Sequence, residues 1–517
     1  MTNRINYKKF RSELTHLDPI HDTPIGVLHP YWARKPLNVL ECIVNNLSKR
    51  NDVILDPFMG SGTTIFAALL NNRKAIGSDL NPLSVFIVQE MIRLGSDLES
   101  LTATLQDFLV KAEQLILPLY EISEGRYIER ERFDVAGDFE HGNFHLKPTE
   151  IVTKELVNGR WSKRKVSKAK FSRSIPTKYR RYLHKPFDFS KSELLYNSRI
   201  AIPEGAKLSH FFSQHNLVSL NILLELSNSS SLNTQKKDIC KFLISASLPL
   251  LRLSDKKASS QWPYWRPKTA LTSRNPIVIL YDRFEQIQAA AQWMALRKSI
   301  TIDALRSKQK SSMVRIGQSS IQNLIRYRTS IKPKLILTDP PYNDHVPYLE
   351  YSALWNNLLG LKIDKKHYRS EIVHTDAPDR KSDSSEYLQR LESAVEVCAR
   401  LISKDGIIVW FYQDQALSSW ASIYSSAKTN KLTIVDIIPI RKQRRSMKAV
   451  TSPEKTLDGD LVIVFSKKKI IPSINKEKNN SDESFFGRYA TLIRKMMLDG
   501  SIEIVAQNYK RISQLIG

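Results

Sequence analysis

Residues 52–64 read Asp-Val-Ile-Leu-Asp-Pro-Phe-Met-Gly-Ser-Gly-Thr-Thr, and this stretch decides the fold class. The apolar run at 52–55 predicts a short buried strand, the small residues after it predict a loop, and residues 65–70 predict a helix. Residues 73–79 predict a second strand, which ends in Asp79. A strand–helix–strand unit of this kind predicts an α/β protein whose mostly parallel sheet carries helices on both faces.

The composition excludes several classes of protein. The chain has 517 residues, of which 42% are apolar and 25% charged, so it is neither wholly disordered nor collagenous. Its three cysteines are far apart, which disfavours a disulfide framework or a metal site. Without a signal peptide or an 18-residue apolar run, the sequence predicts a cytoplasmic protein that avoids membranes. The formal net charge of +26 favours a polyanionic partner, above all nucleic acid.

Further strands are predicted only late in the chain. They lie at 313–316, 334–338, 406–411, 432–438 and 460–465, and the last two are expected to pair antiparallel. We therefore predict one α/β sheet built from residues 1–90 and 312–466, with residues 91–311 inserted and residues 467–517 forming a linker and a helical tail. Within the insertion we expect a helix at 95–120, a loop-rich segment at 124–200 and helices across 206–300.

The inserted region holds the densest positive charge. Residues 151–200 contain 14 Lys and Arg against 3 Asp and Glu. Basic residues interleaved with aromatics suit phosphate contacts, which position a protein on nucleic acid without reading its sequence. The candidates are Lys163, Arg164, Lys165, Arg180 and Arg181, with Arg444 and Arg445 in a second basic run at 441–448. A solvated basic loop is the alternative.

The glycines after the first strand suit a ligand site. Gly60 and Gly62 let the backbone turn sharply and approach a ligand, and the next helix offers its N-terminal N–H groups to an anion. Asp79 ends the second strand, where an acid can accept hydrogen bonds from ribose hydroxyls. The spacing fits neither the dinucleotide motif GxGxxG nor a P-loop. A structural glycine turn with a capping Asp remains open.

A second motif, Asp339-Pro-Pro-Tyr342, directly follows the strand predicted at 334–338. Two prolines stiffen the backbone and remove two N–H donors. A carboxylate, fixed carbonyls and an aromatic ring suit a planar base that carries an amino group, with Tyr342 stacking on the ring. An ordinary Asp-Pro-Pro turn is the alternative.

Together, the two motifs resemble those of the S-adenosylmethionine-dependent amino methyltransferases of DNA, which carry a DPFxGSGT-type loop and a [DNS]PP[YFW] tetrapeptide. The resemblance covers residues 25–90 and 312–466 and implies a Rossmann-like methyltransferase sheet whose last strand is antiparallel. It implies S-adenosylmethionine as cofactor, and the insertion as the region that recognises double-stranded DNA. The implied cofactor-binding residues are Asp56, Phe58, Gly60, Gly62, Thr63, Asp79 and Trp32, and the implied catalytic residues are Asp339, Pro340, Pro341 and Tyr342. Residues 29–36 resemble the family's N-terminal cofactor-flanking segment, whose Trp32, Arg34 and Lys35 would close over the carboxylate end of the cofactor; a surface loop with core aromatics is the alternative.

The resemblance predicts methylation of the exocyclic N6 of a flipped adenine, because Asp at the start of the tetrapeptide is commonest in adenine enzymes. A restriction–modification or phage-defence setting, with a cognate endonuclease or other defence partners, would fit. Gln318 stands where the family often has an acid, and the insertion lies earlier than usual. The alternatives are cytosine-N4 methylation, an RNA base methyltransferase, and a DNA-binding regulator with a decayed methyltransferase fold.

Overall fold

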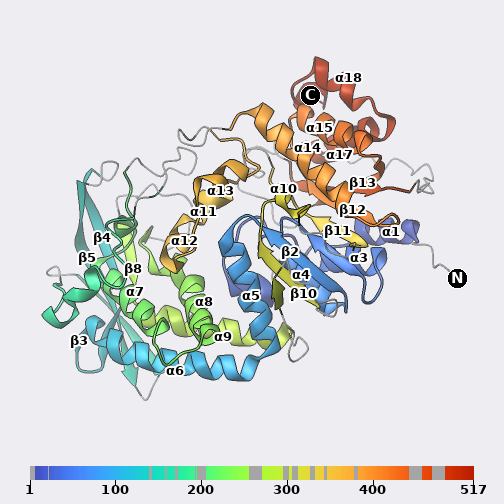
Figure 1. Cartoon of the computed structure of the whole chain (residues 1–517). Coiled ribbons are helices and arrows are strands. Elements are labelled where there is room, and N and C mark those ends of the chain that lie inside the picture. The colour runs from blue at the N-terminus through green and yellow to red at the C-terminus, as the bar shows by residue number, and fades with distance from the viewer. Residues whose placement is uncertain are drawn as a thin grey trace.

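The structure is a computed structural model that describes residues 6–20, 23–138, 143–157, 160–168, 173–192, 194, 205–255, 270–294, 302–304, 313–326, 332–342, 346–375, 377, 382–441, 457–468 and 484–516. It contains two sheets, an eight-stranded one that we call the main sheet and a six-stranded one that we call the inserted sheet (Figure 1).

The main sheet has the strand order β13-β14-β12-β11-β1-β2-β10-β9. Its strands are β1 (Val53–Asp56), β2 (Lys74–Asp79), β9 (Ile302–Ala304), β10 (Val314–Gln318), β11 (Leu335–Thr338), β12 (Ile407–Tyr412), β13 (Thr433–Arg441) and β14 (Gly459–Ser466). Strand β14 runs antiparallel to both of its neighbours, and every other pairing in the sheet is parallel. The predicted Rossmann-like sheet with an antiparallel last strand is confirmed. Strand β9 is an addition, since its residues were expected to belong to the insertion.

Both faces of the main sheet are buried, and the sequence alternation divides its side chains between two cores. In β12, Ile407, Val409 and Phe411 point into one core, whereas Ile408, Trp410 and Tyr412 point into the other. Parallel strands buried in this way read as continuous apolar runs, which is why these strands were predictable from the sequence.

Helices cover both faces of the main sheet. On the first core they are α1 (Tyr7–His16), α2 (Pro24–Leu28), α3 (Leu37–Leu47), α4 (Thr63–Leu70), α5 (Pro82–Ser96), α11 (Tyr348–Tyr351) and α12 (Ala353–Leu359). On the second they are α10 (Ile321–Leu324), α14 (Ser384–Leu401), α15 (Leu417–Thr429), α17 (Phe485–Asp499) and α18 (Ile502–Asn508). The remaining helices of this part are α13 (Lys365–Ser370) and α19 (Ser513–Ile516).

The inserted sheet lies apart from the main sheet, at the left of Figure 1. Its strands are β3 (Glu121–Ser123), β4 (Arg126–Asp138), β5 (Asn143–Val157), β6 (Arg160–Lys168), β7 (Ser254–Asp255) and β8 (Ala270–Arg274), and all of its pairings are antiparallel. Our prediction of a loop-rich segment from 124 was therefore wrong. The strands are rich in charge, and much of that charge is paired across the ladder, as in Arg132–Glu150 at 2.6 Å.

A helical layer supports the inserted sheet and joins it to the main core. It consists of α6 (Leu98–Ile116), α7 (Gln214–Ser227), α8 (Thr234–Leu251) and α9 (Pro276–Met294), with the 3₁₀ turns η1 (Leu117–Tyr120), η2 (Thr177–Leu183) and η4 (Leu208–Phe211). Buried side chains of these helices belong to the same apolar core as those of β1, β11 and α5. The insertion therefore packs on the main sheet through a continuous core.

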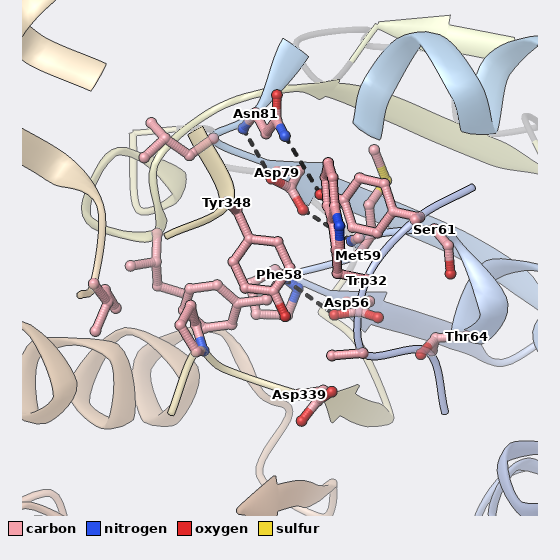
Figure 2. Close-up of a pocket in the computed structure, with 18 of the residues that line it drawn as sticks. Trp32, Asp56, Phe58, Met59, Ser61, Thr64, Asp79, Asn81, Asp339 and Tyr348 are labelled. Atoms are coloured by element: carbon pink, nitrogen blue, oxygen red, sulfur yellow. Dashed lines mark hydrogen bonds between the residues drawn. The ribbon is translucent and has the colours of Figure 1, made fainter. Parts of the chain in front are cut away.

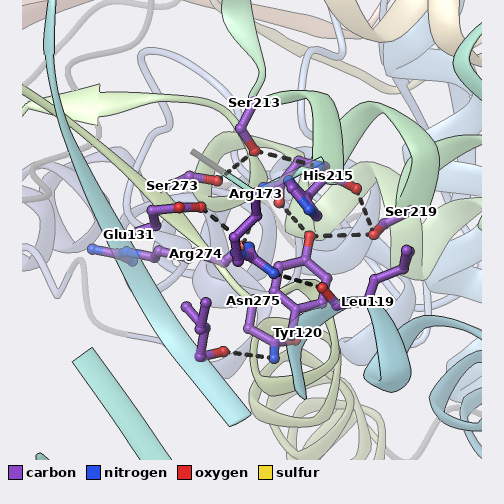
Figure 3. Close-up of polar contacts among 12 residues, drawn as sticks. Leu119, Tyr120, Glu131, Arg173, Ser213, His215, Ser219, Ser273, Arg274 and Asn275 are labelled. Carbon is purple, nitrogen blue, oxygen red and sulfur yellow. Dashed lines mark hydrogen bonds and ion pairs between the residues drawn. The ribbon is translucent and has the colours of Figure 1, made fainter. Parts of the chain in front are cut away.

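A polar network fixes the inserted sheet to this layer (Figure 3). The Arg173 guanidinium donates to the Leu119 carbonyl at 2.6 Å and to Glu131 Oε2 at 3.2 Å. Tyr120 donates from its hydroxyl to Asn216 Oδ1 at 2.6 Å. Arg173 lies in the basic segment 151–200, yet its guanidinium is used in these internal contacts and stabilises the fold.

The first and last helical parts of the chain meet on β13. Asp436 of that strand is buried and accepts hydrogen bonds from Arg11 of α1 and from Arg494 of α17, the latter at 2.8 Å. Burying a carboxylate is costly unless it is paired, and two guanidinium groups compensate this one. The contact ties both helices to the same strand.

The described residues lack two other kinds of feature. None of the described helices is both long and apolar enough to cross a bilayer. No group of three or more His, Cys, Asp or Glu side chains in the described segments is placed to hold a metal ion.

Candidate active site

A pocket of about 840 Å³ opens where β1, β2, β10 and β11 end. Strand order reverses at β1, because β2 pairs on one side of it and β11 on the other. Ligands of open α/β sheets bind at such switch points, beyond the carboxyl ends of the strands. Figure 2 shows Asp79 and Asp339 toward opposite ends of the pocket, with Asp56 and Tyr348 between them.

The glycine loop shapes one wall of the pocket. Gly60 and Gly62 have φ values of +49° and +78°, a left-handed backbone that side chains disfavour. A Cβ at Gly60 would lie 3.3 Å from the Tyr31 ring, and one at Gly62 would lie 2.6 Å from a Val88 methyl. Gly60 lines the pocket, whereas Gly62 is outside its lining and is the N-cap residue of α4.

Asp79 holds the same loop from the end of β2. Its carboxylate accepts hydrogen bonds from the backbone N–H groups of Gly60 and Asn81, both at 2.8 Å. Burial raises the pKa of Asp79 to about 6, although these two hydrogen bonds act in the opposite direction. Two oxygens offer about four acceptor positions, so a carboxylate that already organises the loop can also accept bonds from a ligand.

Asp56 joins the ends of two neighbouring strands. Its carboxylate accepts hydrogen bonds from Thr338 Oγ1 at 2.6 Å and from the Phe58 N–H at 3.1 Å. Burial raises its pKa to about 7. Thr338 directly precedes Asp339, so Asp56 couples the glycine loop to the second motif.

A second pocket, of about 820 Å³, adjoins the first. Tyr342 and Phe411 give it aromatic walls, and Gln413, Arg441 and Asp460 give it polar groups. Pro340 lines this pocket, whereas Pro341 lines the first. Asp339 lines both, so its carboxylate stands where the two pockets meet.

Asp339 takes part in a buried hydrogen-bond network. Its Oδ1 accepts a hydrogen bond from the Tyr342 hydroxyl, and its Oδ2 lies 3.2 Å from Lys35 Nζ. Burial raises the pKa of Asp339 to about 6, while Lys35 pulls it down and Asp460 pushes it up. At pH 7 most of this carboxyl is therefore ionised and can accept protons.

Residues 29–36 separate the two pockets. His29 anchors the segment to the inserted helices, because its Nε2 lies 2.9 Å from Ser245 Oγ of α8. Trp32 packs edge-on against Trp355, with ring centroids 5.6 Å apart. Ala33, Arg34 and Lys35 line both pockets. The sequence left this segment open between a core-packing loop and a ligand-binding one, and its contacts are of both kinds.

Residues 3–90 and 334–499 of the chain match the model of the N6/N4 methyltransferase family, which is described as DNA methylase. The chain belongs to this family. The first matched segment carries the glycine loop and the second carries Asp339-Pro-Pro-Tyr342, so both motifs lie inside the match. The match extends past residue 466, where the resemblance had ended, and includes α17.

Several curated methyltransferases resemble this chain over short segments. M.HindIII of Haemophilus influenzae is 45% identical over 49 residues, which are 10% of this chain and 16% of the relative. M.EcaI of Enterobacter cloacae is 31% identical over 105 residues, 20% of this chain and 22% of the relative. The orphan methyltransferase M.BamHII of Bacillus amyloliquefaciens is 39% identical over 69 residues, 13% and 25% respectively. The aligned segments thus span a quarter or less of these relatives.

The structure brings most of the predicted cofactor residues around the first pocket. They are Trp32, Asp56, Phe58, Gly60, Thr63 and Asp79. Gln318 lies outside the pocket lining and donates to the Leu80 carbonyl at 3.1 Å, whereas the next three residues, 319–321, line the pocket.

The structure describes the predicted nucleic-acid residues unevenly. Lys163 and Arg164 belong to β6, and their side chains lie outside the described part, while Lys165 of β6 is exposed. Arg180 and Arg181 are exposed on η2, where Arg181 pairs with Glu225 at 2.9 Å. Arg444 and Arg445 lie outside the described residues.

Sequence reasoning missed three polar groups of the second pocket. Lys35 was expected beside the cofactor, yet its ammonium lies between Asp339 and Asp460. Asp460 was read only as part of a strand, and Gln413 was not considered. With its amide nitrogen turned toward β14, Gln413 donates to Asp460 Oδ1 at 3.2 Å. A charged residue opening an otherwise apolar strand was the available signal for Asp460.

Proposed function

We propose that the chain is a site-specific DNA methyltransferase that moves a methyl group from S-adenosylmethionine to the exocyclic N6 of a flipped adenine. One observation carries the proposal: Asp339 stands where two pockets meet, one bordered by the glycine loop and the other by aromatic rings. A single acceptor can there face the base in one pocket and the methyl donor in the other.

The chemistry of the first pocket fits S-adenosylmethionine. Asp79 supplies acceptors for ribose hydroxyls, and Asp56 and Asp339 give the pocket a negative character that suits a cationic ligand. The hydroxyls of Ser61 and Thr63, beside the N-terminus of α4, suit the carboxylate of the methionine part.

The second pocket suits an extruded base. Tyr342 and Phe411 offer ring faces for stacking, and this offsets part of the few kcal/mol that unstacking a base costs. Asp339 and the carbonyl of Pro340 are acceptors for the two protons of an exocyclic amine. Two such hydrogen bonds orient the nitrogen lone pair away from the ring plane.

Positioning and charge then carry the reaction. When bound, S-adenosylmethionine supplies a methyl group on a positively charged sulfur, which leaves as a neutral thioether. The lone pair of the amine nitrogen forms the new bond to carbon, and the electrons of the broken carbon–sulfur bond stay on sulfur. Asp339 lies ready to take the proton that the methylated nitrogen loses, because its pKa of about 6 leaves it ionised at neutral pH. Orientation of this kind lowers a barrier substantially.

Mass spectrometry of nucleosides tests the proposal. Plasmid DNA incubated with the protein and S-adenosylmethionine should gain N6-methyladenine, whereas N4-methylcytosine would identify the cytosine-N4 alternative. RNA that competes as the better substrate would favour the RNA alternative.

Asp339→Asn should lower the methylation rate by about 10²–10⁴-fold. Asp405→Asn is a matched control, because Asp405 is half exposed and pairs with Lys334 away from the pockets. Full activity of Asp339→Asn would contradict the mechanism, and a wild-type protein without any methylation would contradict the function.

A further inference from the structure

The ammonium of Lys35 lies in the lining of the second pocket, between groups from two other parts of the chain, the Asp339-Pro-Pro-Tyr342 motif and β14. Its Nζ is 3.0 Å from Asp460 Oδ2, 3.2 Å from Asp339 Oδ2 and 2.8 Å from the Tyr342 hydroxyl oxygen. The Lys35 side chain is only 10% exposed. An ammonium has three protons, so these three oxygens satisfy it fully.

This arrangement occupies the acceptor that the target amine requires. Tyr342 donates to one oxygen of Asp339, and Lys35 holds the other. Both Lys35 and the exocyclic amine of a base are N–H donors, so they compete for the same oxygen. Each carboxylate oxygen can accept a second hydrogen bond, so the base binds Asp339 with least competition when Lys35 gives up this contact.

Asp460 offers Lys35 a place to remain after it has left Asp339. Its Oδ1 is held by Gln413 at 3.2 Å, which leaves Oδ2 directed at the ammonium. A cation that moved into water would leave two buried carboxylates without compensation, which is costly. Asp460 avoids this cost because Lys35 needs only a small shift to stay paired.

The charge balance around Asp339 depends on Lys35. The ionisable groups that face Asp339 or share its pockets come from every element around it. They are Tyr31, Arg34 and Lys35 from the segment before α3, Asp56 from β1, Asp79 from β2, Tyr342 from its own motif, Tyr348 from α11, Glu371 after α13, Arg441 from β13 and Asp460 from β14. Among the described contacts, Lys35 is the member of this set whose positive charge lies within 4 Å of the Asp339 carboxylate. Without it, two carboxylates would share a buried site, where one of them would take up a proton.

We propose that Lys35 is a positioning residue of the target-base pocket, which keeps Asp339 a charged acceptor in the empty site and moves to Asp460 when the exocyclic amine binds. This inference rests on the proposed function. It assigns Lys35 to the base rather than to the cofactor, and it gives Asp460 a role that neither motif contains.

The sign of the pH dependence follows from the charges. Asp339 accepts a proton from the amine only while ionised, so activity should fall as the pH drops below its pKa of about 6. Removing Lys35 takes away a charge that lowers this pKa, and the acid limb should move up by about 1 to 3 pH units. Removing the charge of Asp460 takes away a charge that raises it, and the acid limb should move down.

The experiment compares pH profiles of kcat/KM for the wild type, Lys35→Met, Asp460→Asn and the double variant. We expect the acid limb of Lys35→Met to lie at higher pH than that of the wild type, and the acid limb of Asp460→Asn to lie at lower pH. The acid limb of the double variant should lie at lower pH than that of Lys35→Met. Lys334→Met, an exposed lysine at the start of β11, should leave the limb unmoved.

Other outcomes overturn the inference. A Lys35→Met profile with the wild-type limb, a loss of activity that high pH does not restore, or a double variant without the reverse shift would each do so. The carbon-13 shift of the Asp339 carboxyl, assigned with Asp339→Asn, reports the same titration without turnover. A wild type that shows this titration but methylates nothing would contradict the proposed function and leave the Lys35 effect measurable.

Discussion

The main sheet and the inserted sheet are built on opposite balances of burial and charge. The strands of the main sheet at its centre, β1, β11 and β12, are buried along their whole length. The inserted sheet has only a small apolar cluster of its own, Phe133, Leu253 and Leu271. Its longest strands, β4 and β5, are joined by charged pairs such as Arg126–Glu155 and Lys154–Glu129.

The two sheets therefore differ in how well they tolerate amino-acid substitutions. A sheet buried on both faces leaves little room for an added atom, and the glycine loop that follows β1 lies beside the pocket. A sheet held in part by exposed charge pairs can change side chains at low cost. Substitutions in the two regions test this contrast.

Gly62→Ala should destabilise the fold by about 2–5 kcal/mol, since it combines a disfavoured left-handed backbone with overpacking. Its new Cβ would lie 2.6 Å and 2.9 Å from the two methyls of Val88. Denaturant unfolding measures the stability, and titration with S-adenosylmethionine should show weaker binding, because the loop before α4 must shift.

Gly205→Ala is the matched control for this substitution in the inserted region. Gly205 has a φ of +73°, but a Cβ added there would meet nothing within 4 Å, so only the backbone cost of about 1–2 kcal/mol remains. Gly62→Ala combined with Val88→Ala should relieve the clash, although the smaller side chain costs some core packing. Equal losses for Gly62→Ala and Gly205→Ala would break the contrast between the two regions.

Replacing Lys165 and Lys168 of β6 by alanine should weaken DNA binding about ten-fold at physiological salt. Both are exposed, and removing each phosphate-binding charge should reduce the slope of log K against log salt by about 0.9. Binding titrations over a salt series measure this. The control is Lys9→Ala combined with Lys428→Ala, which removes the same charge from exposed lysines of α1 and α15. It should change DNA binding little. A smaller effect from the β6 pair than from this control would place the DNA elsewhere.

Glu155→Ala should cost under about 1 kcal/mol, because the pair that it forms with Arg126 is partly exposed and strand-to-strand charge pairs contribute little. Denaturant unfolding in low and high salt checks this, and the difference from the wild type should shrink as salt rises. A loss of several kcal/mol would mean that charge pairing, and not the shared helical core, holds the inserted sheet.

The sequence predicted the main sheet because its strands are apolar runs that end in short motifs. It failed for β4 and β5, where residues such as Arg130, Glu131 and Arg132 alternate with few apolar ones and resemble a loop. Those charges are satisfied by partners on other strands or segments, such as Glu150 for Arg132 and Arg173 for Glu131. Pairing of this kind is a long-range property that local periodicity does not carry.

The site divides in the same way. Asp56, Asp79 and Asp339 follow strands, and the parallel topology brings the ends of such strands together, so their proximity was predictable. The contact between Lys35 and Asp460 joins residues 425 positions apart through an antiparallel strand. Asp460 pairs with Ile440 of β13, so the register of the antiparallel strands, and not a local motif, brings it to this pocket.

The buried carboxylate of Asp436 also sets an order of events in biosynthesis. Arg11 and Asp436 lie 425 residues apart, and synthesis at about 5–20 residues per second separates their appearance by roughly 20 to 90 s. During that time Tyr7, Phe10 and Leu14 of α1 have no β13 to cover them. Helix α1 is thus made long before it can reach its final place, and the buried charge is fully compensated only when α17 has followed.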